Sequence, residues 1–156
     1  MALVRILVDG YSLLHKWPEL APGTARFSAA SRDELVQKLT LYRDAVGTPL
    51  TIVFDGANQD IRLSTVDSTP QVEILYSRAG QTADQIIERV AHRMAPYGEI
   101  LAVTDDFAER DTVIAMGGLA SSCYNFIQTV EDALGGVAED VTEYNRRERM
   151  RFQRPP

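Results

Sequence analysis

Residues 3–10 read LVRILVDG, and this stretch decides the fold. Its first six residues are apolar apart from Arg5, and they run directly into Asp9 and Gly10. Other apolar runs of strand length follow along the chain: Leu50–Phe54, Val72–Tyr76, Ile100–Val103 and a short one near Leu119. Continuous apolar character, without alternation, indicates strands that are buried on both faces of a parallel sheet.

Helix signals separate these strands. Residues 31–34 (SRDE) have the form of a capping box and predict a helix that ends at Gly47. Residues 82–85 (TADQ) form a second capping box, and Pro96 and Gly98 end the helix that follows it. Three more helices are predicted: from Asp105 or Asp106 to Gly117, from Ser121 or Ser122 to Leu134, and from Val137 towards Met150.

Strands that alternate with helices, beginning with a strand, are typical of a three-layer α/β/α domain with a mostly parallel central sheet. We expect one domain over residues 1–150, because no linker composition divides the chain. Residues 17–30 and 57–71, rich in polar residues and proline, are expected to be loops.

Composition narrows the class of protein. The single cysteine, Cys123, rules out an internal disulfide framework and a cysteine-based zinc site. No apolar run approaches the roughly 18 residues that a membrane span needs, and we recognise no signal peptide at the N-terminus. We therefore expect a cytoplasmic protein that is not bound to a membrane.

Charge is unevenly distributed along the chain. The formal net charge is −6, yet residues 141–156 carry five arginines against two glutamates. This Arg-rich C-terminal tail, which we place at residues 146–156, contrasts with the acidic body before it. Arginine suits phosphate recognition because its planar guanidinium donates two parallel hydrogen bonds. A solvated helix end is the simpler alternative for the same residues.

Acidic residues follow the strands one after another. Asp9 ends the first strand, Asp55 follows the second, Asp84 lies in the first turn of the helix after the third, and Asp105 and Asp106 follow the fourth. The C-terminal ends of parallel strands lie on one edge of the sheet, where open α/β sheets bind ligands. Each of these acids alone has an ordinary role in a cap or turn, but together they predict one shared site.

Crowded carboxylates repel one another unless a cation neutralises them, and an all-oxygen ligand set suits Mg²⁺ or Mn²⁺. Such an ion activates water and binds phosphate oxygens, so phosphodiester hydrolysis is the predicted chemistry. The candidate residues for holding an RNA backbone are basic: Lys16, Arg78, Arg110, Arg146, Arg147 and Arg149. Ser12 and Thr104 are candidates for hydrogen bonds to a metal-bound water or a phosphate, with local capping as the alternative. Trp17, Tyr11 and Tyr76 are candidates for stacking on bases, or for packing.

Four segments in this order resemble the YacP-like branch of the NYN domain family: DGYSLLHKWPEL (9–20), VFDGA (53–57), TADQIIE (82–88) and VTDDFAER (103–110). The resemblance covers about residues 3–150 and implies a PIN-like fold with divalent-metal-dependent endoribonuclease activity. It also implies RNA as the partner, and some members resemble a ribosome-associated endonuclease that cuts mRNA during translation.

Carried over by position, the resemblance implies that Asp9, Asp84 and Asp106 form the catalytic metal site. Glu109 falls on the glutamate that follows the last of these acids. Asp55 and Glu88 are expected to assist, since Glu88 lies one helical turn after Asp84.

The chain departs from the family pattern at three positions. Ser12 stands where the family usually has Asn, Asp105 where it commonly has Ser, and Arg110 where Gln often follows the glutamate. These departures support an alternative hypothesis, in which the chain is a catalytically weak or inactive module that binds RNA or the ribosome. A third hypothesis, a small-molecule phosphatase of the DxD type, lacks the required second Asp two positions after Asp9.

Overall fold

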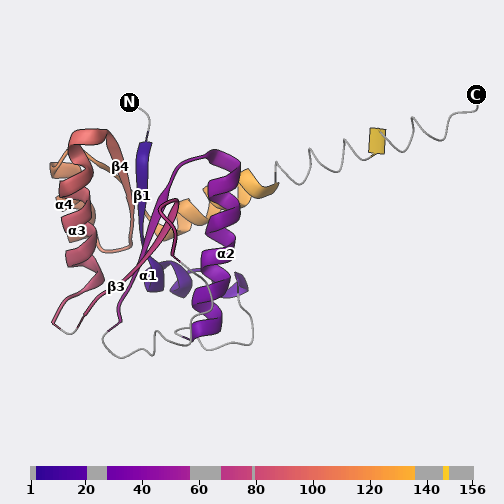
Figure 1. Ribbon diagram of the computed structural model, residues 1–156, viewed down its shortest axis with the longest axis horizontal. Helices are drawn as coiled ribbons and strands as arrows, with labels where there is room; N and C mark the ends of the chain where they lie inside the picture. The colour runs from indigo at the N-terminus through magenta and orange to yellow at the C-terminus, as the bar shows by residue number, and fades with distance from the viewer. Residues whose placement is uncertain (1–2, 21–27, 57–67, 79, 136–145, 148–156) are drawn as a thin grey trace, which may run out of the picture.

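Five parallel strands form one sheet at the centre of the computed structural model, which describes residues 3–20, 28–56, 68–78, 80–135 and 146–147 (Figure 1). The strands are β1 (Leu3–Asp9), β2 (Leu50–Phe54), β3 (Val72–Tyr76), β4 (Glu99–Val103) and β5 (Leu119–Ser121). Their order in space is β3-β2-β1-β4-β5, and every neighbouring pair is parallel. The predicted α/β fold is confirmed, and the sheet is parallel throughout.

Helices cover both faces of this sheet. The first face carries α1 (Gly10–His15), α2 (Ala29–Val46) and a helix over residues 123–135, whose buried residues share one apolar cluster with β1 and β2. The second face carries α3 (Ala83–Met94) and α4 (Phe107–Ala115), which share a second cluster. Figure 1 shows α2 and the α3–α4 pair on opposite sides of the strands. Two short 3-10 helices, η1 (Pro18–Leu20) and η3 (Ala95–Tyr97), complete the described elements.

Alternate residues of β1 face the two clusters. Ile6 and Val8 pack into the first cluster, whereas Leu7 packs into the second. All three side chains are at most 1% exposed. Since side chains alternate across a strand, a strand covered on both faces needs apolar residues at every position. This explains why Ile6, Leu7 and Val8 are consecutive apolar residues.

Helix starts test the capping signals directly. The capping box at Thr82 is confirmed, because its side chain accepts from the Gln85 N–H and the Gln85 side chain accepts from the Thr82 N–H. The prediction of Ser31 as the N-cap of α2 is wrong: the N-cap is Ser28, three residues earlier, and the helix begins at Ala29. Serine at either position has the same capping chemistry, so residues 31–34 resembled a cap while already lying inside the helix.

Parts of the prediction lie outside the described residues. These include most of the predicted helix from Val137 towards Met150, of which residues 146–147 are described and helical. The single-domain assignment to residues 1–150 stays a prediction. Across the described ranges, no helix combines the length and apolarity that crossing a membrane requires.

Gly10 lies where β1 passes directly into α1. A Cβ atom at this position would lie 2.4 Å from the ring of Phe54, which is fully buried. The Phe54 ring is itself held between Tyr11 and Tyr76, with centroid separations of 5.1 and 5.7 Å. Phe54 therefore has little room to move, and glycine lets α1 begin directly above β2.

We expect Gly10→Ala to destabilise the protein by about 1–3 kcal/mol, the usual effect of overpacking a filled core. Gly135→Ala is the matched control, because among the described residues no atom beyond its chain neighbours and the backbone of its own helix lies within 4 Å of the position its Cβ would take. Urea unfolding of both variants measures the difference. Equal stability of the two would mean that the Phe54 ring yields easily.

Candidate active site

The strand order places a ligand-binding crevice at the end of β1. The chain leaves β1 for β2 on one side of the sheet, and β4 pairs with β1 on the other side. Such a switch point, at the C-terminal edge of parallel strands, is where open α/β sheets bind ligands. Asp9 is the last residue of β1, so its carboxylate lies at this point.

Three acids from three separate segments meet there. Asp9, Asp84 and Glu109 each offer one carboxylate oxygen, and these oxygens lie within 4.8 Å of one another. Asp9 comes from β1, Asp84 from the first turn of α3 and Glu109 from the first turn of α4. We call these residues the three-acid cluster. Their separation in sequence means that only the folded sheet brings them together.

Local structure holds each member of the three-acid cluster. Asp9 is the N-cap of α1 and accepts a hydrogen bond of 3.3 Å from the Ser12 backbone N–H. Asp84 lies between Thr82 and Gln85, the two residues of the capping box that sets the first turn of α3. Glu109 shares the buried face of α4 with Val113, four residues later.

Glu109 is the most unusual group of the cluster. Its side chain is 2% exposed, and as an ionised carboxylate it accepts no hydrogen bond from the described residues. Burial, with the neighbouring Asp84 and Asp9, raises the pKa of Glu109 to about 9. Burial also raises the pKa of Asp9, although hydrogen bonding from Ser12 opposes part of that shift. Without a cation, this cluster therefore binds protons in place of carrying three charges.

These features fit a hard divalent cation. Buried polar atoms without a partner are rare in folded proteins, and an ion is one of the ordinary explanations. The donors are carboxylates only, which is the ligand chemistry of Mg²⁺ and Mn²⁺. Asp9, Asp84 and Glu109 are therefore the residues that would hold the metal.

Asp106, the third metal ligand inferred from the sequence, lies outside the three-acid cluster. Its Oδ1 caps α4 by accepting from the backbone N–H groups of Ala108 and Glu109, at 2.9 and 3.3 Å, and the residue is exposed. We therefore revise the proposed metal set by replacing Asp106 with Glu109. The signal for Glu109 was present in the sequence: an acid four residues before Val113, on the apolar face of a helix.

Two variants distinguish the two possible metal sets. Asp106→Asn should leave the affinity for Mn²⁺ within about threefold, because Asn caps a helix as well as Asp. Glu109→Gln should lower that affinity by more than the roughly 10–100-fold that loss of an outer-shell partner causes. Calorimetric titration with Mn²⁺ measures both. If Asp106→Asn loses the metal while Glu109→Gln keeps it, the revised set is wrong.

Asp105, the acid that departs from the family pattern, has structural partners. One oxygen of its carboxylate forms an ion pair of 3.3 Å with Arg110 and accepts from the Cys123 backbone N–H at 2.9 Å. It thereby ties the start of α4 to the start of the helix over residues 123–135. Burial and the adjacent Asp105 raise the pKa of the Cys123 thiol to about 12, which keeps the thiol protonated.

The other predicted supporting residues surround the cluster without joining it. The exposed Asp55 accepts a hydrogen bond of 3.1 Å from the Ser77 hydroxyl. The buried Thr104 hydroxyl accepts from the Asp106 N–H at 3.2 Å, so it acts in local capping. Glu88 is half-buried on α3, one turn after Asp84. Of the two roles considered for Trp17, packing is the one observed, since this side chain is 3% exposed within the first apolar cluster.

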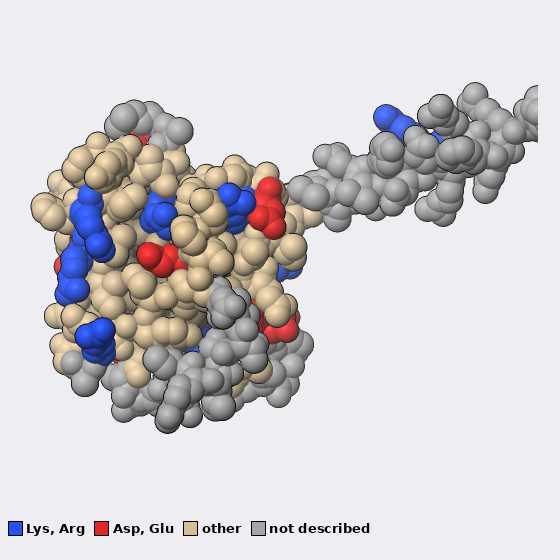
Figure 2. Space-filling model, in the orientation of Figure 1, with Lys and Arg blue, Asp and Glu red and all other residues tan. Residues whose placement is uncertain are grey.

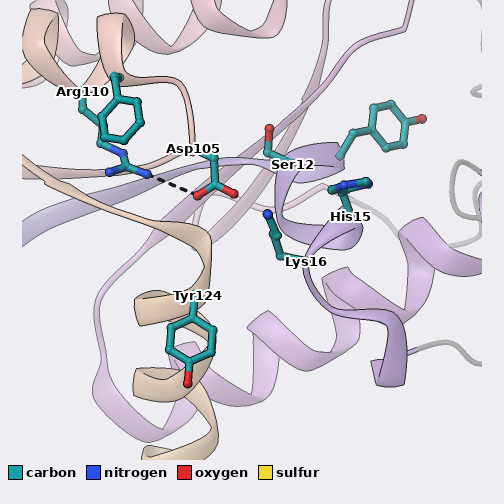
Figure 3. Close-up of a pocket in the computed structure, with 8 residues that line it drawn as sticks. Ser12, His15, Lys16, Asp105, Arg110 and Tyr124 are labelled. Atoms are coloured by element: carbon teal, nitrogen blue, oxygen red, sulfur yellow. Dashed lines mark hydrogen bonds and ion pairs between the residues drawn. The ribbon is translucent and has the colours of Figure 1, made fainter.

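The predicted RNA-binding residues fall in three places. Lys16 and Arg110 line a groove beside the three-acid cluster, together with Ser12, His15, Asp105 and Tyr124 (Figure 3). Arg78 is exposed just before α3, and Arg146 and Arg147 are exposed in the described part of the tail. Arg149 lies outside the described residues.

Sequence reasoning missed further basic residues near Arg78. Arg89 and Arg93 are exposed on α3, whose N-terminal turn carries Asp84. Figure 2 shows basic side chains along the side of the molecule on which Figure 1 places α3 and α4. Their spacing of four residues, with apolar residues between them, was the available signal for one exposed helix face.

The parallel sheet and the acids at its switch point are the arrangement of a PIN-like domain. The chain belongs to the YacP-like NYN domain family, whose model matches residues 6–155. YacP of Bacillus subtilis (strain 168) is 30% identical over 127 residues, which cover 81% of this chain and 74% of that protein.

Solved structures agree with this assignment. The crystal structure of Rae1 (YacP) from Bacillus subtilis matches with a TM-score of 0.77 at 25% identity, covering 96% of this chain and 85% of Rae1. The W164L mutant of the same protein matches with a TM-score of 0.75 at 25% identity, covering 92% of this chain and 84% of that one. The fold and family inferred from the sequence are thereby confirmed.

Proposed function

We propose that this protein is an endoribonuclease that hydrolyses RNA phosphodiester bonds with Mg²⁺ or Mn²⁺ bound at Asp9, Asp84 and Glu109. The single observation that carries the proposal is the buried Glu109 carboxylate, which has no hydrogen-bond partner among the described residues and lies beside two other acids. Membership of the nuclease-type NYN family supports RNA as the substrate.

Each residue has a part in this reaction. The bound cation supplies an activated water and neutralises charge on the phosphate. Asp9, Asp84 and Glu109 hold the cation, and the Ser12 backbone N–H orients Asp9. Asp55 and Glu88 lie nearby as further acids, while Lys16, Arg78 and the tail arginines are the cations proposed to bind the RNA backbone.

Two features support activity over an inactive binding module. Ser12 in place of Asn still supports Asp9, because the contact comes from its backbone N–H. The extra charge of Asp105 is paired with Arg110. The inactive-module hypothesis relied on these two departures, and their local roles weaken it.

The finer prediction, that the RNA is mRNA on a ribosome, comes from the family resemblance. A cytoplasmic location is a separate prediction, which rests on the composition of the chain. The test incubates the protein with an end-labelled single-stranded RNA and, in parallel, with translating ribosomes, in Mn²⁺, in Mg²⁺ and in EDTA. Metal-dependent cuts that generate new internal ends are expected in at least one of the two substrates. RNA that stays intact in both, with every metal, would contradict the proposal.

A further inference from the structure

A groove of about 720 Å³ adjoins the three-acid cluster. It is lined by residues of α1 on one side and by the start of α4 on another, with Tyr124 of the helix over residues 123–135 at its rim (Figure 3). Ser12 belongs to its lining, and the Ser12 backbone N–H bonds the Asp9 carboxylate. The groove and the proposed metal site are therefore neighbours along α1.

Exposed aromatic rings distinguish this groove from the rest of the surface. Among the described residues, three aromatic side chains are strongly exposed: Tyr97 at 73%, Phe107 at 74% and Tyr124 at 66%. Phe107 and Tyr124 line the groove. Tyr97 lies just before β4 begins, at the opposite edge of the sheet. Two of the three strongly exposed rings among the described residues thus line the groove beside the three-acid cluster.

Phe107 forms a cation–π contact with Arg110. The Arg110 guanidinium lies 4.7 Å from the centre of its ring. That guanidinium is itself fixed, since it donates to the Thr104 carbonyl at 2.7 Å and to Asp105 at 3.3 Å. With 74% of Phe107 exposed, the ring has one face supported by a fixed cation and another open to a flat ligand. This is the arrangement of a stacking platform.

The charges of the groove suit a phosphate chain. Asp105, the one acid in its lining, is paired with Arg110 and accepts a hydrogen bond from the Cys123 N–H. Lys16 is exposed, and its side chain forms no ion pair with any residue in the described ranges. Figure 3 shows the Lys16 amino group and the Arg110 guanidinium on opposite sides of the Asp105 carboxylate. An unpaired cation thus lies between the aromatic rings and α1.

We propose that this groove binds unpaired nucleotides of single-stranded RNA next to the bond that is cut. One base stacks on Phe107, Tyr124 contacts a neighbouring base, and Lys16 binds the phosphate between them. Bases in a duplex are already stacked on each other and cannot reach an exposed ring, so single-stranded RNA is the specific ligand. The inference rests on the proposed function, because it assigns a binding site for that function's substrate.

The test measures binding without cleavage. A short fluorescein-labelled oligoadenylate is titrated by anisotropy into Glu109→Gln protein that carries, in turn, Phe107→Ala, Tyr124→Ala, Lys16→Gln or the control Tyr97→Ala. All four added changes are at exposed positions, so the fold is expected to persist. Phe107→Ala should weaken binding about tenfold or more, as loss of a base-stacking ring does. Tyr124→Ala should weaken it less, and Tyr97→Ala less than twofold.

Salt dependence provides an independent readout. Lys16→Gln should reduce the slope of log affinity against log salt by about 0.7, the value for one phosphate contact on a single strand. The inference is overturned if Phe107→Ala binds like Tyr97→Ala, if the same sequence in a duplex binds more tightly, or if oligoadenylate does not bind.

Failure of the inference differs from failure of the proposed function. If otherwise wild-type protein carrying Phe107→Ala cuts RNA with unchanged kcat and KM, the groove assignment is wrong and the nuclease assignment stands. If wild-type protein leaves both the free RNA and the mRNA on translating ribosomes intact, in Mn²⁺ and in Mg²⁺, while binding still depends on Phe107, the nuclease assignment is wrong and the groove assignment stands.

Discussion

Asp9→Asn should lower the rate of RNA cleavage at least about 100-fold while leaving the fold unchanged. Loss of an outer-shell partner of a metal site already lowers activity about 10–100-fold, and Asp9 is a proposed direct ligand at the centre of the three-acid cluster. The fold should persist because the Asn amide oxygen still accepts the Ser12 N–H that caps α1. Single-turnover cleavage of an end-labelled RNA in Mn²⁺ measures the effect.

Asp111→Asn is the matched control for this experiment. Asp111 is exposed on α4, two residues after Glu109, and it lies outside the three-acid cluster. The Asp111→Asn substitution removes one negative charge, as Asp9→Asn does, from the same edge of the protein. The cleavage rate of the Asp111→Asn variant should therefore stay within about twofold of wild type. Cleavage by Asp9→Asn at the control rate would remove Asp9 from the mechanism.

Glu109→Gln should make the metal-free protein more stable at pH 8. The pKa of Glu109 is raised from 4.5 to about 9 in the folded protein, so the unfolded chain loses this proton at a lower pH than the folded one. The free energy of unfolding of metal-free wild type therefore falls as the pH rises from about 4.5 to about 9. Glutamine has no proton to lose, so the free energy of unfolding of the variant does not fall in this way.

The size of the effect follows from linkage. This pKa shift lowers the free energy of unfolding of metal-free wild type, relative to Glu109→Gln, by roughly 2–5 kcal/mol at pH 8. Thermal or urea unfolding in EDTA resolves a difference of this size easily. Excess Mn²⁺ should narrow the difference, because it stabilises wild type by about 2.7 kcal/mol at a hundredfold excess over Kd and does not stabilise the variant. If wild type in EDTA is equally stable at pH 5 and pH 8, and Glu109→Gln is no more stable than wild type, the pKa of Glu109 is not raised in the folded protein.

Much of the fold could be predicted because its signals are local. The apolar run after Met1 and Ala2 became a strand covered on both faces, and the runs at β2 and β3 have the predicted limits. The capping box at Thr82 set the start of α3 for the same reason. In each case the side chains that determine the element lie within a few residues of it.

The errors arose where several local solutions compete. Ser28 and Ser31 are equivalent caps by chemistry, and only the packing of α2 on the sheet selects the earlier one. The six-residue helix α1 was not predicted as a separate element. A helix this short shows little periodicity in its sequence and is stabilised by tertiary packing, here with Gly10 close to the Phe54 ring. Trp17 looked suited to a ligand, yet it is buried in the first apolar cluster.

The sequence by itself determined that acids follow successive parallel strands and therefore share one edge of the sheet. It also placed the chain near a family with that arrangement, which the comparisons support. Which acids converge was decided by the tertiary structure alone. Asp106 and Glu109 are one helical turn apart, and the docking of α4 against α3 leaves the first exposed as a cap and buries the second beside Asp9 and Asp84. Helix orientation depends on contacts between distant segments, and these contacts bury the Glu109 carboxylate where it accepts no hydrogen bond from the described residues.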